Sequence, residues 1–200
     1  MTCLKKCYLR YVFHFFDFSS KKFLLFEKVL DRLFKPSAVG NEVDKESTFW
    51  RKLKQCCRTR WVEKVDSFDS FASLFDVVVE TLQEIAENSR DSIGYPWQND
   101  SITQARAYLK GMLEFKFIFT LEVVRKCLAY IRSLTVRLQE KGGDIAKAFG
   151  HVQTVMSSLH GVRCPENIEK HHAEMFQAAM KVADKHEVPV EKPRICNTQR

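Results

Sequence analysis

Residues 67–88 read SFDSFASLFDVVVETLQEIAEN and contain the clearest periodic pattern in the chain. Large apolar side chains recur there at intervals of three and four residues, at Phe68, Phe71, Phe75, Val78, Leu82 and Ile85. Residues with this spacing lie on one side of an α-helix, so the pattern predicts a long helix with one buried face. We expect this helix to begin at Asp66 or Ser67 and to end near Asn88.

An upstream helix is predicted before Lys35-Pro36, because the residue that precedes a proline is disfavoured in a helix. Ser19 or Ser20 can cap its start, and it should run to about Phe34. Its predicted buried face consists of Phe23, Phe26, Leu30 and Leu33.

Further helices are predicted downstream. Residues from about 102 to 140 should form one long helix, or two that meet near Gly111, where the missing side chain permits a kink. A helix from Asp144 to Gly161 should follow, and another from Pro165 to about Lys185. The predicted inward residues of the first of these two are Ile145, Phe149, Val152, Met156 and Leu159.

The composition agrees with an all-α helical bundle. The chain has only 7 Gly and 5 Pro, and its 45% apolar residues are enough to fill a core. The first 18 residues are an exception, because their many aromatic residues show no clear period, and we expect an irregular element there. No stretch is apolar for long enough to span a bilayer, so no membrane partner is expected.

The net charge of +7 is concentrated in the first third of the chain. Residues 1–64 carry 15 Lys or Arg against 7 Asp or Glu, whereas residues 65–200 carry 17 against 18. Within the strip 49–64, the candidate phosphate contacts are Arg51, Lys52, Lys54, Arg58 and Arg60. An acidic segment follows from Asp66 to Asp91, and the alternative interpretation is that the two segments neutralise each other or are solvated.

The cysteines and histidines do not form a convincing chemical site. Seven Cys in irregular positions do not suggest a disulfide framework, and a reducing compartment is expected. Cys56-Cys57 with His171-His172 could supply four metal ligands, but adjacent cysteines lack the spacing with which two thiolates reach one zinc ion. The sequence contains no glycine-rich phosphate loop and no His-Glu-x-x-His, so neither a metal nor a cofactor is predicted.

Trp61 stands among cations just before the long predicted helix. One interpretation is that its indole anchors the start of this helix in the core. The other is that Arg58 and Arg60 contact phosphates while Trp61 stacks on an unpaired or flipped base. Residue types alone leave both interpretations open.

Residues 57–63 read CRTRWVE, and Thr59-Arg60-Trp61 resembles the Thr-Arg-Trp motif of hAT-superfamily transposases. The wider order is similar to transposase-derived proteins related to the repressor of the inhibitor of the protein kinase and to zinc finger MYM-type proteins. The matching positions are Phe15-Phe16, Ser19-Ser20, Lys21-Lys22, Arg106-Ala107, Leu113, the segment 117–138, Pro193-Arg194 and Gln199-Arg200. The resemblance covers most of the chain from about Tyr11.

This resemblance implies a ribonuclease-H-like core interrupted by a helical insertion. It assigns residues 1–48 to a remnant of that core, 49–187 to the insertion and 188–200 to an exposed tail. The catalytic Asp, Asp and Glu of such transposases would lie outside the 200 residues, so no catalytic residue is expected within them. The resemblance also implies a nuclear protein in which Trp61 helps to hold hairpin or single-stranded DNA.

Two other functions fit the same sequence. The helices could form a protein-interaction module, or a homo-oligomer, whose affinity would change little with salt. Alternatively, the chain is the product of a decayed element without a selected function.

Overall fold

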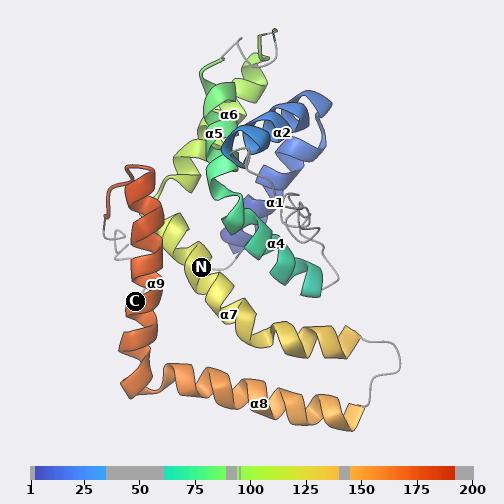
Figure 1. Ribbon diagram of the computed structural model, residues 1–200, viewed down its shortest axis with the longest axis vertical. Helices are drawn as coiled ribbons and strands as arrows, with labels where there is room; N and C mark the ends of the chain where they lie inside the picture. The colour runs from blue at the N-terminus through green and yellow to red at the C-terminus, as the bar shows by residue number, and fades with distance from the viewer. Residues whose placement is uncertain (1–2, 35–60, 89–93, 95, 140–144, 192–200) are drawn as a thin grey trace, which may run out of the picture. The chain divides into compact units, whose positions relative to one another are not determined.

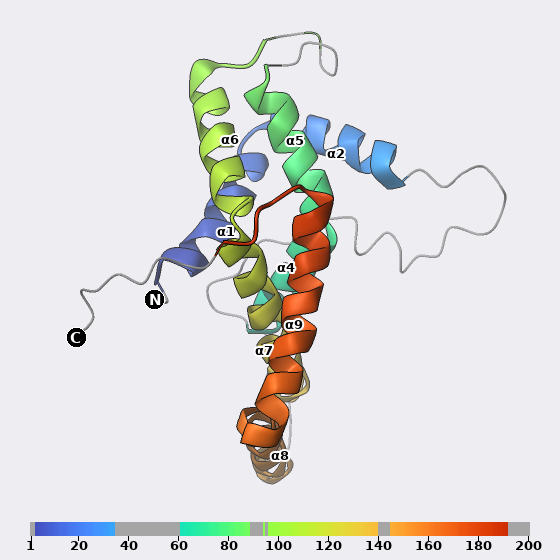
Figure 2. The same cartoon turned by 90° about the vertical axis from the view of Figure 1, so that its left-hand side faces the viewer.

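The protein is described by a computed structural model that covers residues 3–34, 61–88, 94, 96–139 and 145–191 (Figures 1 and 2). These residues contain eight α-helices and no strand, so the predicted all-α class is confirmed for them. The chain divides into two compact units, Met1–Lys110 and Gly111–Arg200, which we call unit 1 and unit 2. The predicted boundary between residues 48 and 49 lies outside the described residues, and the assignment of remnant and insertion stays a prediction.

Helix α1 (Cys3–Asp17) occupies the segment for which an irregular element is predicted, and that prediction is wrong. Its buried side is formed by Leu9, Val12, Phe13, Phe15 and Phe16. The helical period is hard to see in the sequence because Tyr11 and Phe18 place further aromatic rings on the exposed side.

Helix α2 (Ser20–Phe34) has the predicted bounds but a different buried face. Phe26 and Leu30 are buried as predicted, whereas Phe23 and Leu33 are 40% and 43% exposed. Leu25 and Val29 are buried in their place. Apolar residues on α2 form two overlapping faces, so their spacing alone does not decide which face lies against the core.

The long helix predicted around residues 67–88 is present as two helices, α4 (Trp61–Ser73) and α5 (Phe75–Ala86). The helix begins at Trp61, earlier than the predicted start at Asp66 or Ser67. The apolar seam is confirmed from Phe71 onward, because Phe71, Phe75, Val78, Leu82 and Ile85 are all buried, whereas Phe68 is only partly buried. Leu74 interrupts the helix with φ −103° and ψ 13°. Just before Leu74, the hydroxyl of Ser73 donates a hydrogen bond to the carbonyl of Asp69, one turn earlier, at 2.9 Å. Such a contact often accompanies a bend in a helix.

Aromatic rings join the helices of unit 1. The ring of Phe13 on α1 meets Phe71 on α4 edge to face, with 5.7 Å between ring centroids. Phe16 lies 5.5 Å from Phe26 on α2, and Phe71 lies 6.1 Å from Phe75 on α5. Edge-to-face and tilted pairs are favourable geometries for such rings, so this cluster fixes how α1, α2, α4 and α5 meet.

Helix α6 (Asn99–Met112) is tied to the end of α5, beside which it lies in both views (Figures 1 and 2). Asn88 has φ 55°, and its Oδ1 accepts a hydrogen bond from the backbone N–H of Trp97 at 2.7 Å. Arg106 of α6 donates hydrogen bonds to the Ala86 carbonyl from Nε at 3.3 Å and from Nη2 at 3.0 Å. Arg106 thereby provides a donor for the Ala86 carbonyl, one of the carbonyl groups that the end of α5 leaves without a partner in the helix.

Unit 2 contains α7 (Phe115–Gln139), α8 (Ile145–Arg163) and α9 (Pro165–Lys185), and each of these helices contacts the other two. Because α6 ends at Met112 and α7 begins at Phe115, the prediction of two helices that meet near Gly111 is confirmed. Figure 1 shows α8 returning along the C-terminal part of α7, and α9 lying along its N-terminal part.

The predicted buried face of α8 is wrong in part. Phe149 and Met156 are 66% and 59% exposed, whereas Val155 is buried. Val152 and Leu159, which are also predicted to face inward, are partly buried, so the less exposed side of α8 includes Val152, Val155 and Leu159. Packing on both α7 and α9 sets this orientation, which the spacing within α8 does not reveal.

The bounds of α9 confirm the prediction of a helix from Pro165 to Lys185. Glu187 has φ 54°, and the N–H of Val188 donates to the Ala183 carbonyl at 2.8 Å, which closes the helix with a Schellman turn. Val188, the first residue of the predicted tail, is therefore buried, whereas residues 189–191 are exposed.

Within the described parts of the chain, no helix combines the length and the apolar composition needed to cross a membrane.

Replacing Phe71 with Ala should lower the free energy of unfolding by about 3–5 kcal/mol, because it leaves a cavity among fully buried rings. The matched change Phe23→Ala should cost about 1 kcal/mol or less, because that ring is 40% exposed. Urea denaturation followed by circular dichroism measures both values. Equal losses would contradict the orientation of α2.

Candidate nucleic-acid interface

The predicted DNA-binding strip leads into the first residue of α4. Trp61 begins this helix, and its side chain lies outside the described part of the structure. The other predicted contacts also lie outside the described residues: Arg51, Lys52, Lys54, Arg58 and Arg60. Their part in DNA binding therefore stays a prediction, and the structure defines only the helix that follows them.

Helix α4 is held firmly by its buried side. Val65, one turn after Trp61, is 1% exposed, and the ring of Phe71 is fully buried against Phe13. The first turn of any helix has N–H groups without helical partners, and the helix dipole places partial positive charge there. Phosphate groups bind favourably at such an end, so a cationic strip that enters α4 suits an anionic ligand.

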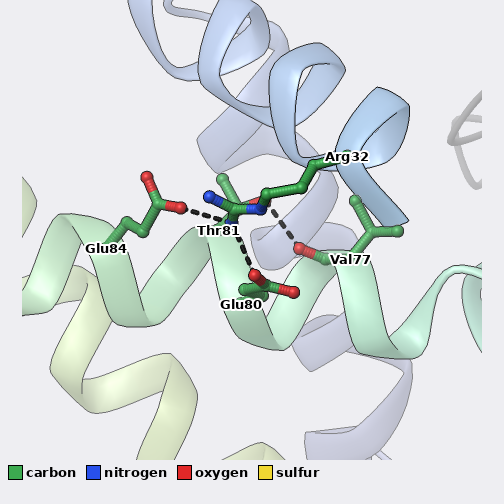
Figure 3. Close-up of polar contacts among 5 residues, drawn as sticks. All are labelled: Arg32, Val77, Glu80, Thr81 and Glu84. Carbon is green, nitrogen blue, oxygen red and sulfur yellow. Dashed lines mark hydrogen bonds and ion pairs between the residues drawn. The ribbon is translucent and has the colours of Figure 1, made fainter. Parts of the chain in front are cut away.

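Part of the acidic segment is paired with a cation of α2. Arg32 Nη2 lies 2.5 Å from Oε1 of Glu80 and 2.5 Å from Oε1 of Glu84. Figure 3 shows the guanidinium reaching from α2 toward both carboxylates on α5. The hydrogen bond to Glu84, with the negative charges of both carboxylates, raises the pKa of Arg32 above its usual value. The acidic surface of α5 is therefore partly neutralised within unit 1.

This pairing bears on the alternative interpretation of the charge pattern, in which the acidic segment neutralises the basic strip. Arg32 precedes the strip, so at least two of the acidic residues have a partner elsewhere. The basic residues of the strip up to Arg60 lie outside the described residues, so whether they pair with the acidic segment stays a prediction.

Two lysines at the start of α2 lie over aromatic rings. Lys21 Nζ is 4.2 Å from the ring centroid of Trp97 and donates a hydrogen bond to the Pro96 carbonyl at 3.0 Å. Lys22 Nζ is 3.6 Å from the ring centroid of Phe15. Burial lowers the pKa of Lys22, and the charge of Asp100 partly opposes this effect. Both cations stabilise contacts within unit 1. The sequence does not reveal the role of Lys21, because Trp97 is distant from it in the chain.

Of the two histidines considered as metal ligands, His172 contacts α7, because its ring meets Phe119 edge to face with centroids 5.7 Å apart. The same ring stacks on Phe176 of its own helix, with centroids 6.0 Å apart. Nδ1 of His171 is 3.5 Å from Oε2 of Glu174, too far for a good hydrogen bond, so the two groups attract each other only when the imidazole is protonated. Cys56 and Cys57 lie outside the described residues, so the zinc interpretation is not tested.

Glu174 also links α9 to α7. Nζ of Lys126 lies 3.2 Å from Oε2 of Glu174 and, as the largest effect, lowers the pKa of that carboxyl group. These contacts give the His171 region a structural role in unit 2.

Replacing Arg32 with Met should lower the free energy of unfolding by less than about 1 kcal/mol, because its ion pairs are half exposed and the Met side chain keeps the apolar contacts. The loss should shrink in concentrated salt, which screens exposed charges. Urea titrations at low and high NaCl concentration test this. A large loss that does not depend on salt would contradict a surface ion pair.

The chain is distantly similar in sequence to two known proteins. No protein-family profile matches the chain, and no solved structure shows significant similarity to it. Two curated proteins are similar, and both are named 52 kDa repressor of the inhibitor of the protein kinase. The human protein is 30% identical over 143 residues, and the mouse protein is 29% identical over 143 residues.

The similar region includes 72% of this chain but only 18% of each relative, so the chain spans less than a fifth of their length. The predicted resemblance to proteins related to this repressor is thereby confirmed at the level of distant similarity. The chain is thus similar to one part of a much longer repressor protein.

Proposed function

We propose that the chain is derived from a hAT-type transposase, corresponds to its helical insertion region, and binds hairpin or single-stranded DNA through the strip 49–64. Under this proposal these 200 residues are non-catalytic by themselves and act in the nucleus. Two-metal cleavage of DNA requires several carboxylates around two ions, and the resemblance puts the catalytic carboxylates outside this segment.

The similarity to the repressor proteins supports the proposed origin, because it extends over 72% of the chain. The helical character of every described element is compatible with an insertion domain built from helices. The Thr59-Arg60-Trp61 motif, on which the resemblance to hAT transposases rests, immediately precedes and begins α4.

One observation carries the DNA-binding proposal: the cationic strip that contains Arg58 and Arg60 runs directly into Trp61 at the start of α4. Cations attract the phosphate backbone, and an indole gives any unpaired base a stacking surface. The strip also lies in the part of the chain that has the positive excess, since residues 1–64 carry 15 cationic against 7 acidic side chains.

Replacing Trp61 with Ala should weaken binding to hairpin or single-stranded DNA by about 1–3 kcal/mol, the contribution of one base stacked on an aromatic ring. Fluorescence anisotropy of a labelled hairpin measures the affinity. The salt dependence of binding should stay the same, because this change removes no charge.

The matched control is the double variant Arg58→Gln, Arg60→Gln. It should weaken binding and also reduce the slope of log affinity against log salt by about 1–2, because up to two phosphate contacts are lost. The proposal is wrong if Trp61→Ala leaves the affinity unchanged while the variant remains folded, or if the parent chain does not bind DNA at low salt.

A second candidate function is supported by α8. Phe149 and Met156 lie seven residues apart on this helix, therefore on one face, and both are largely exposed. An exposed apolar face is typical of a surface that contacts another protein. Binding of this kind should depend little on salt, which distinguishes it from binding to phosphates.

A further inference from the structure

The outward face of α1 carries three ring-bearing side chains in a row. Tyr11, His14 and Phe18 are spaced by three and four residues and are all exposed, with Tyr11 at 58% and Phe18 at 74%. We call these three residues the α1 stripe. The opposite side of α1 packs in the core, so these rings are not needed to fill the interior of unit 1.

Two rings of the stripe are already arranged as a stack. The centroids of His14 and Phe18 lie 3.8 Å apart, and the ring planes differ by only 19°. The N–H of Phe18 donates to the His14 carbonyl at 3.3 Å, which continues the helical geometry one residue beyond α1. Phe18 therefore presents a flat ring in a defined position rather than on an open loop.

A second aromatic group holds the helix that carries Tyr11. Tyr108 of α6 meets Tyr8 and Phe15 edge to face, with centroid distances of 5.9 Å and 5.3 Å. The hydroxyl of Tyr8 donates a hydrogen bond to the Tyr108 carbonyl at 2.6 Å. These contacts hold α1 against α6, so the α1 stripe has a rigid support.

The charge of α1 indicates what kind of ligand fits the stripe. Among the described side chains of α1, Arg10 is an exposed cation close to the stripe, one residue before Tyr11 and one turn before His14. A surface that combines exposed rings with a cation is complementary to an anionic chain of flat, aromatic units. Unpaired nucleic acid has this chemistry, because its phosphates attract cations and its bases stack on side-chain rings.

We propose that the α1 stripe, with Arg10 beside it, is a base-stacking platform for single-stranded DNA. The inference rests on the proposed DNA-binding function but names a site separate in sequence from the strip 49–64. Bases stack on Phe18 and Tyr11, and Arg10 contacts the phosphate backbone between them.

The test uses the whole 200-residue chain and a fluorescent oligothymidylate of about 20 nucleotides, long enough for several stacked bases, at about 50 mM NaCl. Phe18→Leu keeps an apolar side chain but removes the ring, and it should weaken binding by about fivefold to a hundredfold. Tyr11→Leu should act in the same direction. Phe18→Tyr keeps the ring and should bind as the parent does, within about twofold.

Phe34→Leu is the matched control, because it removes a ring that is 46% exposed from the end of α2 and belongs to neither proposed binding surface. It should leave the affinity for the oligonucleotide unchanged. Circular dichroism should show the same helix content and the same melting temperature for all these variants within about 2 °C, because the altered side chains are exposed.

Three results would overturn the inference. If Phe18→Leu and Tyr11→Leu bind like the parent while Trp61→Ala binds more weakly, the α1 stripe is not a DNA site but the proposed function stands. If the parent chain does not bind DNA, both fail. If the stripe variants abolish dimers in sedimentation without changing DNA affinity, a second copy of the chain covers the stripe.

Discussion

The contact between Phe13 of α1 and Phe71 of α4 is the interaction on which the arrangement of unit 1 depends. Phe71 continues the apolar seam of α5 and also lies against α1, so one buried ring packs against both neighbouring helices. Because Phe13 faces this core, Tyr11 and Phe18 on the other side of α1 face solvent. The same contact fixes the backbone of the helix that Trp61 begins.

Charge has two roles in unit 1. Some cations stabilise contacts within the fold: Arg32 pairs with carboxylates of α5, and Lys21 lies over the ring of Trp97. The exposed Arg10 beside the α1 stripe, and the strip that ends at Trp61, instead have the composition of surfaces that contact phosphates. The proposed function therefore assigns two cationic, aromatic surfaces to the same third of the chain.

Sequence periodicity predicts the seam from Phe71 to Ile85, because large apolar residues recur there at helical spacing. The start of α9 is predicted by Pro165, which suits a first helical position. Periodicity fails where apolar residues lie on more than one side of a helix, as on α1, α2 and α8. There the buried face is decided by the neighbouring helices, which local spacing does not reveal. The spacing of Tyr11, His14 and Phe18 indicates a stripe only if α1 is known to be a helix. The strip at Trp61 is visible in the sequence because it combines charge with a motif.

The most direct test is an NMR titration of the ¹⁵N-labelled chain with hairpin DNA, observing the indole N–H signals of its 3 tryptophans. The Trp61 signal is assigned with Trp61→Phe, and Trp97, which is 7% exposed, serves as the internal reference. The account predicts that the Trp61 signal shifts in proportion to bound DNA while the Trp97 signal stays in place. An unmoved Trp61 signal in the DNA-bound state would contradict it.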